Sequence, residues 1–532
     1  MRTGSRTSAS RVLVALLVAA GGLLAACGGG AGKAAFQPQT NAGEIVVKTS
    51  APAMPFDSRL LGTNVPAWLG ADRLGDADFQ AKTIALGTTV VRIPGGSWSN
   101  GYDWLACENQ EGTCAYDNPA RPTDFLEFLR DTGAGGMWTL SINGTAQEAA
   151  ALVAFFNGDV DDDTTIGPDR NGRDWKTVGT WAKLRAAHGN AKPFPITLWE
   201  VGNEVYGSKP SAGGDQCADF GWEDGWTCDG SEYVRGDDEH DGYLAVRAAM
   251  IAVDPDILVG AVGVDEQSAW SDWGNEVIRD TGSRLDFYIV HHYGFNGEPK
   301  ADEVLDVAPE AWPAIMADVN TAFRDVGGGR IVPVAITEYN LVAFQDGDTK
   351  RLMTQARNAL FIADSIGQMA SNGVSMANQW NLANGRPANG TDYGLIDADT
   401  GVRSPQYYAM ALWAGFGTEL LEQSAAEIEQ SDVRTYVGRS ADGTITVLAI
   451  NLTDASQKRS FRIEGLSGTA TAVVDAMTAA TIDATEVAYN GSTEPSLDLR
   501  QPAGQGLTVA NGSFDYAFPA WSITRFRIPP AG

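Results

Sequence analysis

Between residues 60 and 415, short apolar segments of strand length alternate with longer segments of helical periodicity. The predicted strands are residues 60–64, 88–93, 137–142, 197–201, 257–262, 287–291, 332–337 and 375–380. The predicted helices include residues 123–132, 146–156, 175–187, 242–253, 311–326 and 352–369. Such alternation is typical of a parallel sheet, because each return to a parallel strand needs a crossover connection. Eight such strands predict an α/β fold of the (β/α)₈ TIM-barrel type.

The pattern changes after about residue 417, where short apolar strands are separated by turns rich in Gly, Ser and Asp. Short strands with regular turn signals are typical of an antiparallel β-sandwich. We therefore predict two domains, a barrel over residues 43–416 and a C-terminal β-sandwich over residues 417–532. Residues 43–50 are also a candidate strand of the sandwich.

The first 26 residues have the features of an export signal rather than of a folded domain. Three arginines precede an apolar run over residues 12–26, which is too short to span a bilayer comfortably. The run ends in Leu-Ala-Ala-Cys, which resembles a bacterial lipobox with Cys27 as the lipidated residue. We predict a lipoprotein signal peptide over residues 1–26, a membrane anchor at Cys27 and a flexible tether over residues 27–42. An ordinary secretory signal followed by an unrelated cysteine is the alternative.

Four further cysteines agree with an exported chain, because disulfides persist in oxidising compartments. They form two closely spaced couples, Cys107 with Cys114 and Cys217 with Cys228, in loops rich in Gly, Asp and Glu. A metal site is the alternative, but no histidine lies near the first couple and the spacings match no common zinc pattern. We predict two disulfides and no metal, in a lipoprotein on the cell surface or facing a periplasm.

The formal charge of −29 argues against nucleic acids and other anionic polymers as partners. Such a surface repels nucleic acids and anionic polymers, and it suits an exported protein that acts on neutral substrates. Fifteen tryptophans and fourteen tyrosines are compatible with sugar binding, because aromatic faces pack on sugar rings. Large cores use the same residues, so composition alone does not identify a carbohydrate partner.

Two of the predicted strands end in a glutamate. Glu204 follows the strand Ile-Thr-Leu-Trp-Glu-Val, and Glu338 follows the strand Val-Pro-Val-Ala-Ile-Thr. In a barrel the carboxyl ends of all strands meet at one face, where active sites lie. A carboxylate left beside apolar neighbours without partners costs several kcal/mol, so two of them need an explanation.

Cleavage of a glycosidic bond supplies such an explanation. It needs one carboxyl group to protonate the leaving oxygen and another to attack or to activate water. We interpret Glu204 and Glu338 as this pair. Structural carboxylates that hold loops through arginines are the alternative, and a common one for either residue alone. Glu200 is a further candidate acid, but its mid-strand position favours a structural salt bridge.

The residues around both glutamates resemble the acid/base and nucleophile motifs of retaining barrel glycosidases, and most of all those of the α-L-arabinofuranosidases of glycoside hydrolase family 51. The two motifs are Trp-Glu-Val-Gly-Asn-Glu at residues 199–204 and Thr-Glu-Tyr-Asn at residues 337–340. Further matches, in chain order, are residues 92–96, 101–104, 121–125, 143–145, 184–189 and 291–293. The resemblance therefore extends from about residue 60 to residue 410.

The resemblance implies a role for each glutamate. Glu204 would be the general acid/base, with its pKa raised by the charge of the nucleophile. Glu338 would be the nucleophile, kept ionised by Arg92 and other donors. A retaining mechanism implies carboxyl groups about 5–5.5 Å apart and a covalent glycosyl-enzyme intermediate. It implies no metal and no organic cofactor.

The resemblance also implies the residues that surround the sugar. Asn203 would bind the 2-hydroxyl group, and Tyr293 would orient the nucleophile. His291 and Asn143 would line the site of the sugar that is released. Arg92 would hold both substrate and nucleophile in place.

Two stretches depart from the family pattern and leave the identity of the sugar open. The family usually has a glutamate after the first strand that holds arabinofuranose hydroxyls, whereas this chain has Asn64 there and no acid. In the eighth strand, Trp380 stands near the usual glutamine position. We interpret both as substrate-binding residues. The segment between Cys217 and Cys228 has the features of an insertion above the cleft.

These observations predict a retaining glycosidase that releases α-L-arabinofuranosyl groups from polysaccharides or oligosaccharides. A β-xylosidase or an endo-β-glycanase with the same catalytic pair is one alternative, and a non-catalytic glycan-binding lipoprotein is another. Calcium binding is an alternative to a solvated loop at Asp159, Asp161 and Asp163. The oligomeric state is open.

Overall fold

The computed structural model describes residues 44–530, except for residues 111–113, 115–116, 211–216, 218, 221–222, 224 and 425–431. The predicted signal peptide and the whole of the predicted tether, including Cys27, lie outside these residues, so the lipid anchor stays a prediction. In the part of the chain that is described, no helix has the length and apolarity needed to cross a bilayer.

Eight parallel strands form a closed barrel, which confirms the predicted fold. In their order around the barrel they are β3 (Gly62–Asn64), β4 (Val90–Ile93), β5 (Gly135–Leu140), β6 (Leu198–Val201), β9 (Leu258–Val262), β10 (Phe287–Phe295), β11 (Val334–Val342) and β12 (Met376–Gln379). Strands β10 and β11 continue past their predicted ends, because their last residues pair with one another as far as Phe295 and Val342.

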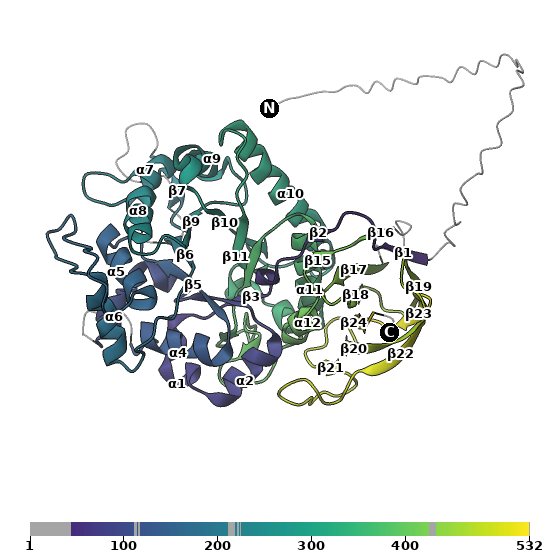
Figure 1. Cartoon of the computed structure of the whole chain (residues 1–532). Coiled ribbons are helices and arrows are strands. Elements are labelled where there is room, and N and C mark those ends of the chain that lie inside the picture. The colour runs from purple at the N-terminus through teal and green to yellow at the C-terminus, as the bar shows by residue number, and fades with distance from the viewer. Residues whose placement is uncertain are drawn as a thin grey trace, which may run out of the picture. The chain divides into compact units, whose positions relative to one another are not determined.

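Helices surround the barrel strands (Figure 1). They are α1 (Gly70–Leu74), α2 (Ala77–Leu86), α3 (Trp104–Glu108), α4 (Pro122–Thr132), α5 (Ala146–Asn157), α6 (Val178–Ala187), α7 (Gly230–Arg235), α8 (Tyr243–Val253), α9 (Ala269–Thr281), α10 (Val304–Asp325), α11 (Ala356–Ser371) and α12 (Pro405–Trp413). Local signals fix several of their starts. The side chains of Thr145 and Glu148, for example, bond each other's backbone amides at the start of α5.

Helix α10 begins before its predicted start at residue 311. Proline usually ends a helix, yet α10 contains both Pro309 and Pro313. The buried side chains Val304, Ala308 and Trp312 keep helical spacing across them. Burial of this apolar face therefore outweighs the hydrogen bonds that the prolines remove.

The barrel interior is filled mainly near the amino ends of its strands. The side chains that form this inner cluster are Val90, Met137, Leu198, Phe287, Ile289, Ala335 and Met376. Four of them are the first residues of their strands. This filling leaves the carboxyl ends of the strands for polar side chains.

Among the described residues, β7 (Gly207–Ser208) with β8 (Asp219–Phe220) and β13 (Ala383–Asn384) with β14 (Ile396–Asp397) form separate two-stranded sheets. The other strands outside the barrel form the β-sandwich domain, whose continuous hydrogen-bonded path is β16-β1-β19-β23-β22-β20-β24-β18-β17-β15-β2, with β21 paired to β20 off this path. Their bounds are β1 (Glu44–Lys48), β2 (Met54–Pro55), β15 (Glu419–Leu420), β16 (Glu422–Ser424), β17 (Val433–Arg439), β18 (Ile445–Asn451), β19 (Gln457–Ile463), β20 (Thr469–Thr478), β21 (Ala488–Tyr489), β22 (Gln505–Ala510), β23 (Ser513–Phe518) and β24 (Ser522–Ile528). Strand β1 pairs antiparallel with β16 and parallel with β19, so it belongs to the sandwich. The other pairs of this sheet are antiparallel.

The sandwich packs against α11 and α12 of the barrel domain. Asp364 of α11 accepts hydrogen bonds from Arg434 and from the hydroxyl of Tyr436, the latter at 2.7 Å. Gly367 permits this approach, because a Cβ atom there would lie 2.2 Å from the Tyr436 ring. Arg525 donates to the carbonyl of Ala414 after α12, at 2.9 Å. The sandwich thus supports the helix that follows β11, the strand that carries Glu338.

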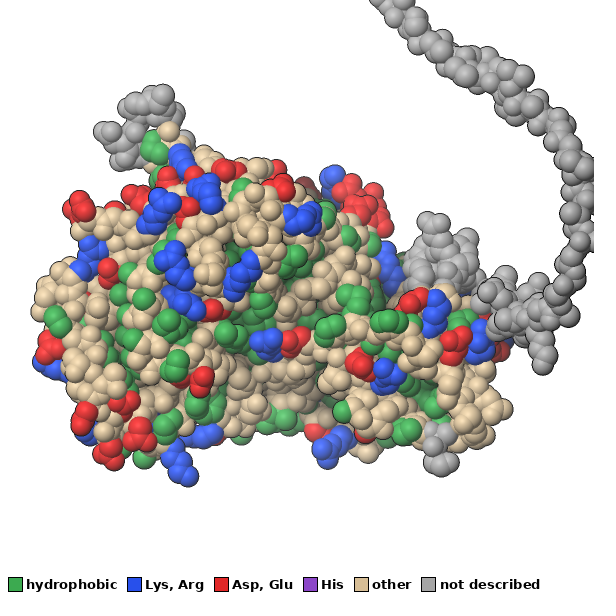
Figure 2. Space-filling model, turned by 45° about the horizontal axis from the view of Figure 1, so that its top comes forward, with side chains coloured by type: hydrophobic (Ala, Val, Ile, Leu, Met, Phe, Trp, Pro, Cys, Tyr) green, Lys and Arg blue, Asp and Glu red, His purple; other side chains and the backbone are tan. Residues whose placement is uncertain are grey.

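Figure 2 shows one face of the molecule, on which acidic and basic side chains are interspersed among polar and apolar ones. The negative formal charge is therefore not confined to a single acidic patch on this face.

Candidate active site

A cavity of about 330 Å³ lies at the carboxyl ends of the barrel strands, and both Glu204 and Glu338 line it. The lining residues are Gly96, Ser97, Asn203, Glu204, Tyr206, Asp265, Trp270, His291, His292, Tyr293, Asn296, Glu338, Ala343, Phe344 and Trp380. The cavity walls combine aromatic rings with carboxylates and amides, which is typical of sites that bind small polar ligands.

Glu338 projects from β11 beside an irregularity in the pairing with β10. Val290 pairs with Ile336 and His291 pairs with Glu338, so Thr337 is an extra residue on β11. Bulges of this kind redirect side chains and occur often at active sites. Glu338 accepts hydrogen bonds from Arg92 Nη1 and from the Tyr293 hydroxyl, each at 2.7 Å.

Glu204 follows β6 and adopts a left-handed backbone conformation, with φ of 48°. This conformation is strained for a residue other than glycine and is frequent at functional sites. One carboxylate oxygen of Glu204 lies 2.8 Å from His291 Nδ1, and His291 Nε2 lies 2.9 Å from the Thr337 hydroxyl. The histidine thus links the Glu204 side chain to the bulge of β11.

The two carboxyl groups face a common space. One oxygen of Glu204, one oxygen of Glu338 and a ring nitrogen of His291 all lie within 4.8 Å of one another. Retaining glycosidases place their carboxyl groups about 5–5.5 Å apart, whereas inverting enzymes need about 6.5–9.5 Å to admit a water molecule. The spacing of Glu204 and Glu338 fits the retaining arrangement.

Arg92 connects the nucleophile candidate to the residues beneath it. It is fully buried and forms ion pairs with Glu200 and Glu338. It also donates to Asn64 Oδ1 at 2.9 Å and to Asn203 Oδ1 at 2.7 Å. Burial lowers the pKa of Arg92, but the charges of Glu200 and Glu338 outweigh this effect and the net pKa is raised. The guanidinium therefore remains charged beneath the cavity.

Burial raises the pKa of Glu338, and the charge of Glu204 acts in the same direction. His291, Arg92 and the Tyr293 hydroxyl lower this pKa but do not offset burial. The donors expected around Glu338 are therefore present, while its net pKa lies above the ordinary value. Burial also lowers the pKa of His291, which favours a neutral imidazole beside Glu204.

We expect Tyr293→Phe to move the acidic limb of the kcat/KM profile to higher pH. The Tyr293 hydroxyl donates to the ionised form of Glu338, so its loss disfavours the anion and raises the pKa of Glu338 further. Activity would then fall more at low pH than at neutral pH. A pH–rate profile of both proteins checks this, and an unchanged acidic limb would contradict it.

The structure places the other residues singled out in the sequence at different depths. Asn203, His291, Tyr293 and Trp380 line the cavity. Asn64 is fully buried beneath it, where it bonds Arg92 and the carbonyl of Thr337.

Glu200 and Asn143 lie away from the cavity lining. Glu200 is fully buried, paired with Arg92, and accepts a hydrogen bond from Thr139 at 2.6 Å. These contacts fit the structural salt bridge expected from its mid-strand position. Asn143 is exposed, and its amide donates to the carbonyl of Asn100 at 3.2 Å. It is therefore not among the described residues that line the cavity.

Behind the cavity lining, two residues that hold Asn203 were not predicted from the sequence. Asn100 bonds the backbone of Asn203 in both directions, with Nδ2 donating to the carbonyl at 2.8 Å and Oδ1 accepting from the amide at 3.1 Å. Glu223 accepts from the side-chain amides of both asparagines, each at 3.0 Å. Asn100 directly precedes one of the matched motifs, which could have indicated it. Glu223 lies in the apparent insertion, where no motif marked it.

Trp380 forms one wall of the cavity and packs closely on Gly96. A Cβ atom at Gly96 would lie 2.3 Å from Cη2 of the Trp380 ring, and Gly96 has a φ of 64°. Trp380 also makes an edge contact with Trp68 at 6.0 Å between ring centroids. The ring thus contacts both a glycine that permits its approach and a second aromatic side chain.

We expect Gly96→Ala to lower kcat/KM by about 100-fold, because displacement of a positioning group by about 1 Å can cost that much. The new methyl group must displace the Trp380 ring from the cavity wall. Gly133→Ala is a suitable control, since its φ is also positive and nothing lies within 4 Å of its Cβ position. Steady-state kinetics check this, and similar kcat/KM values for the two variants would contradict it.

Glu204, His291 and Glu338 are the one group among the described residues whose carboxylate and imidazole atoms are close enough to share a metal ion. The charge of Arg92, which contacts Glu338 directly, disfavours a cation there. The acidic loop of Asp159, Asp161 and Asp163 does not form such a group.

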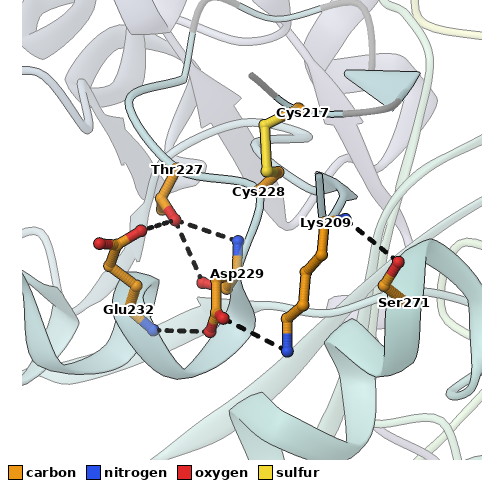
Figure 3. The surroundings of a disulfide bond; sticks show 7 residues. All are labelled: Lys209, Cys217, Thr227, Cys228, Asp229, Glu232 and Ser271. Atoms are coloured by element: carbon orange, nitrogen blue, oxygen red, sulfur yellow. Dashed lines mark hydrogen bonds and ion pairs between the residues drawn. A yellow bond between two sulfur atoms is a disulfide. The ribbon is translucent and has the colours of Figure 1, made fainter. Parts of the chain in front are cut away.

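The structure joins the cysteines in the two expected pairs, Cys107 with Cys114 and Cys217 with Cys228. The second pair lies directly before α7, whose first turn is capped by Asp229 (Figure 3).

Comparison with known proteins places this geometry among related folds. No family model matches the chain. It is 27% identical over 225 residues to an intracellular exo-α-(1→5)-L-arabinofuranosidase of Streptomyces lividans, a match that covers 39% of this chain and 28% of that protein. It is 25% identical over 228 residues to an intracellular exo-α-(1→5)-L-arabinofuranosidase of Bacillus subtilis, a match that covers 41% of this chain and 38% of that protein. The chain therefore spans well under half the length of these relatives.

Solved structures match over most of the chain. An α-L-arabinofuranosidase from Thermotoga maritima, in complex with arabinose, has a TM-score of 0.67 and 19% identity, covering 91% of this chain and 99% of that one. A family 51 α-L-arabinofuranosidase from Bifidobacterium longum has a TM-score of 0.66 and 16% identity, with the same coverage. These likenesses confirm the two-domain fold, and they agree with the resemblance to family 51 seen in the sequence.

Proposed function

We propose that this protein is a retaining glycoside hydrolase that releases α-L-arabinofuranosyl groups from polysaccharides or oligosaccharides. The observation that carries the proposal is the approach of Glu204 and Glu338 to within 4.8 Å across one cavity at the barrel mouth. Two carboxyl groups in this arrangement can act on the two sides of a single anomeric carbon.

In the first step, a carboxylate oxygen of Glu338 attacks the anomeric carbon as the bond to the leaving oxygen breaks. Glu204 gives its proton to that oxygen, and the sugar becomes an ester of Glu338. In the second step, Glu204 removes a proton from water, the water oxygen attacks the anomeric carbon, and Glu338 leaves as a carboxylate. Two displacements restore the configuration of the substrate.

The surrounding residues support these roles. Arg92 and Tyr293 each donate to one oxygen of Glu338, which holds the nucleophile in place and stabilises the carboxylate as it leaves. The imidazole of His291 contacts Glu204, and because it is neutral it carries no positive charge that would favour the ionised form of Glu204. Asn203, fixed on Arg92, presents its amide at the cavity wall, where it can bind a sugar hydroxyl.

The arabinofuranosyl specificity rests on two lines of support. The sequence relatives named above are exo-acting arabinofuranosidases, and solved structures of α-L-arabinofuranosidases, one of them of family 51, match 91% of the chain. An endo-β-glycanase is the second candidate, because a bifunctional glucanase-xylanase also matches the fold with a TM-score of 0.56. The arabinofuranosidase structures match with higher TM-scores.

A panel of nitrophenyl glycosides tests the proposal. We expect the α-L-arabinofuranoside to be the preferred substrate, and proton NMR of the first product to show the α-anomer. Preference for a β-xyloside would change the sugar and keep the mechanism. Release of the inverted anomer would reject double displacement.

We further propose that the chain is exported and held to a membrane by a lipid on Cys27. The support is the lipobox-like sequence that precedes this residue. We expect the Cys27→Ser variant of the full chain to leave the membrane fraction of the host cell. Retention of the variant in that fraction would contradict the proposal.

A further inference from the structure

Glu223 is a buried carboxylate that the mechanism above does not use. Its side chain is almost fully buried, with 4% of its surface exposed, and it does not line the cavity. One carboxylate oxygen accepts from Asn203 Nδ2 and the other from Asn100 Nδ2, each at 3.0 Å. Burial and the charge of Glu204 raise the pKa of Glu223, and hydrogen bonds with Ser97, Asn100 and Asn203 oppose the rise.

These contacts decide which way the Asn203 amide faces. A carboxylate only accepts hydrogen bonds, so Glu223 selects the NH₂ group of Asn203. The carbonyl oxygen of that amide is then turned toward Arg92 Nη2, 2.7 Å away. Asn100 holds the backbone of Asn203 on the same side. Glu223 and Arg92 therefore fix the amide from opposite ends and leave one N–H of Asn203 for a ligand.

The segment closed by the Cys217–Cys228 disulfide carries Glu223 to this place, and several bonds attach its end to the barrel. Trp226 Nε1 donates to the carbonyl of Ile142, directly beyond β5, at 3.1 Å. Figure 3 shows the contacts around the disulfide, where Asp229 caps α7 and also pairs with Lys209 at 3.3 Å. Lys209 in turn pairs with Glu276 of α9. Asp229, the residue that follows Cys228, thus attaches this end of the segment to α7 directly and to α9 through Lys209.

We propose that Glu223 is a positioning residue for the hydrolytic reaction, which orients the Asn203 amide for the sugar hydroxyl, and that the Cys217–Cys228 disulfide keeps it there. This inference rests on the proposed function. It adds that part of the site is assembled from the disulfide-closed segment. Loss of either Glu223 or the disulfide therefore has the same consequence at Asn203.

The Glu223→Gln variant is the direct test. Glutamine keeps the size of the side chain, but it has one oxygen for two amide donors, so its own NH₂ group faces that of an asparagine. We expect kcat to fall about 10- to 100-fold with little change in KM, because hydrogen bonds to the 2-hydroxyl strengthen in the transition state. A 2-deoxy substrate lacks this hydroxyl, so wild type and variant should hydrolyse it at similar rates.

The disulfide provides the matched comparison. We expect Cys217→Ser with Cys228→Ser to reproduce the loss in kcat, and its combination with Glu223→Gln to add little. Cys107→Ser with Cys114→Ser opens a comparably short loop that does not carry Glu223, and it should leave kcat unchanged. Thermal unfolding of each variant shows whether it is folded at the assay temperature.

A crystal structure of Glu223→Gln separates this inference from the proposed function. We expect the Asn203 amide to turn away from Arg92, whatever glycoside the wild type cleaves. An unmoved amide would overturn the positioning role, as would an equal loss in kcat on the 2-deoxy substrate. If the wild type cleaves no glycoside, the proposed function fails while the structure still decides the role of Glu223.

Discussion

The Glu338→Ala variant is expected to lose about 10⁴-fold or more in kcat, because the reaction then lacks the nucleophile of its first step. The cavity and the residues that contact the sugar remain, so binding of the substrate should persist. Added azide can occupy the vacated space and attack the anomeric carbon in one displacement. We therefore expect a glycosyl azide of inverted configuration, identified by proton NMR.

Asp265→Asn is the matched control for this result. Asp265 also lines the cavity, but it contacts His292 and belongs to neither carboxyl group of the pair. Its loss should be less than about tenfold, in line with the removal of one partly exposed hydrogen bond. A loss of similar size for Glu338→Ala and Asp265→Asn would contradict the assignment of Glu338.

The Glu204→Ala variant is expected to respond to the leaving group of the substrate. For an alkyl arabinofuranoside, loss of the acid should lower kcat/KM about 10²- to 10⁴-fold. A dinitrophenyl arabinofuranoside needs no protonation to leave, so its kcat/KM should change little. Its kcat should fall, because the second step now lacks the base that activates water. Steady-state kinetics with both substrates check this pattern.

Azide distinguishes the two glutamates. In Glu204→Ala, azide should accelerate the second step by attacking the ester of Glu338, and the glycosyl azide should keep the configuration of the substrate. Retention here and inversion with Glu338→Ala would assign the two roles independently. Equal losses on both leaving groups, or an inverted azide from Glu204→Ala, would contradict the acid/base role of Glu204.

The strand pattern predicted the barrel well. Parallel strands buried on both faces are nearly continuous apolar runs, and these are visible in the sequence between the helical segments. The sequence did not predict the last residues of β10 and β11. Residues there such as His292 and Asn340 are polar, and they are in strand conformation because the two strands pair with each other. The bulge at Thr337 was also missed. A bulge depends on the register between two strands, which neither strand contains alone.

For the site, position at a strand end was the informative signal. It indicated Glu204, Glu338, His291 and Tyr293, all of which line one cavity. It could not separate residues on the cavity surface from those beneath it. Asn64, for example, follows the same pattern but is buried under the site.

Glu223 lay beyond the reach of sequence reasoning for a different reason. It is distant in sequence from any barrel strand, and its contact with Asn203 beyond β6 is long-range, like that of Trp226 with Ile142 beyond β5. Such a contact depends on the path of a long loop, for which local propensity carries little information. The acidic composition of the segment gave no reason to prefer Glu223 over its neighbours.

Trapping of the covalent intermediate tests the central claim most directly. A 2-deoxy-2-fluoro arabinofuranoside with a dinitrophenyl leaving group should form the glycosyl-enzyme and hydrolyse it slowly, since fluorine destabilises both transition states. Mass spectrometry of a protease digest should then find one added fluorosugar, on Glu338. Attachment to any other residue, or turnover to the inverted sugar without an adduct, would contradict the account.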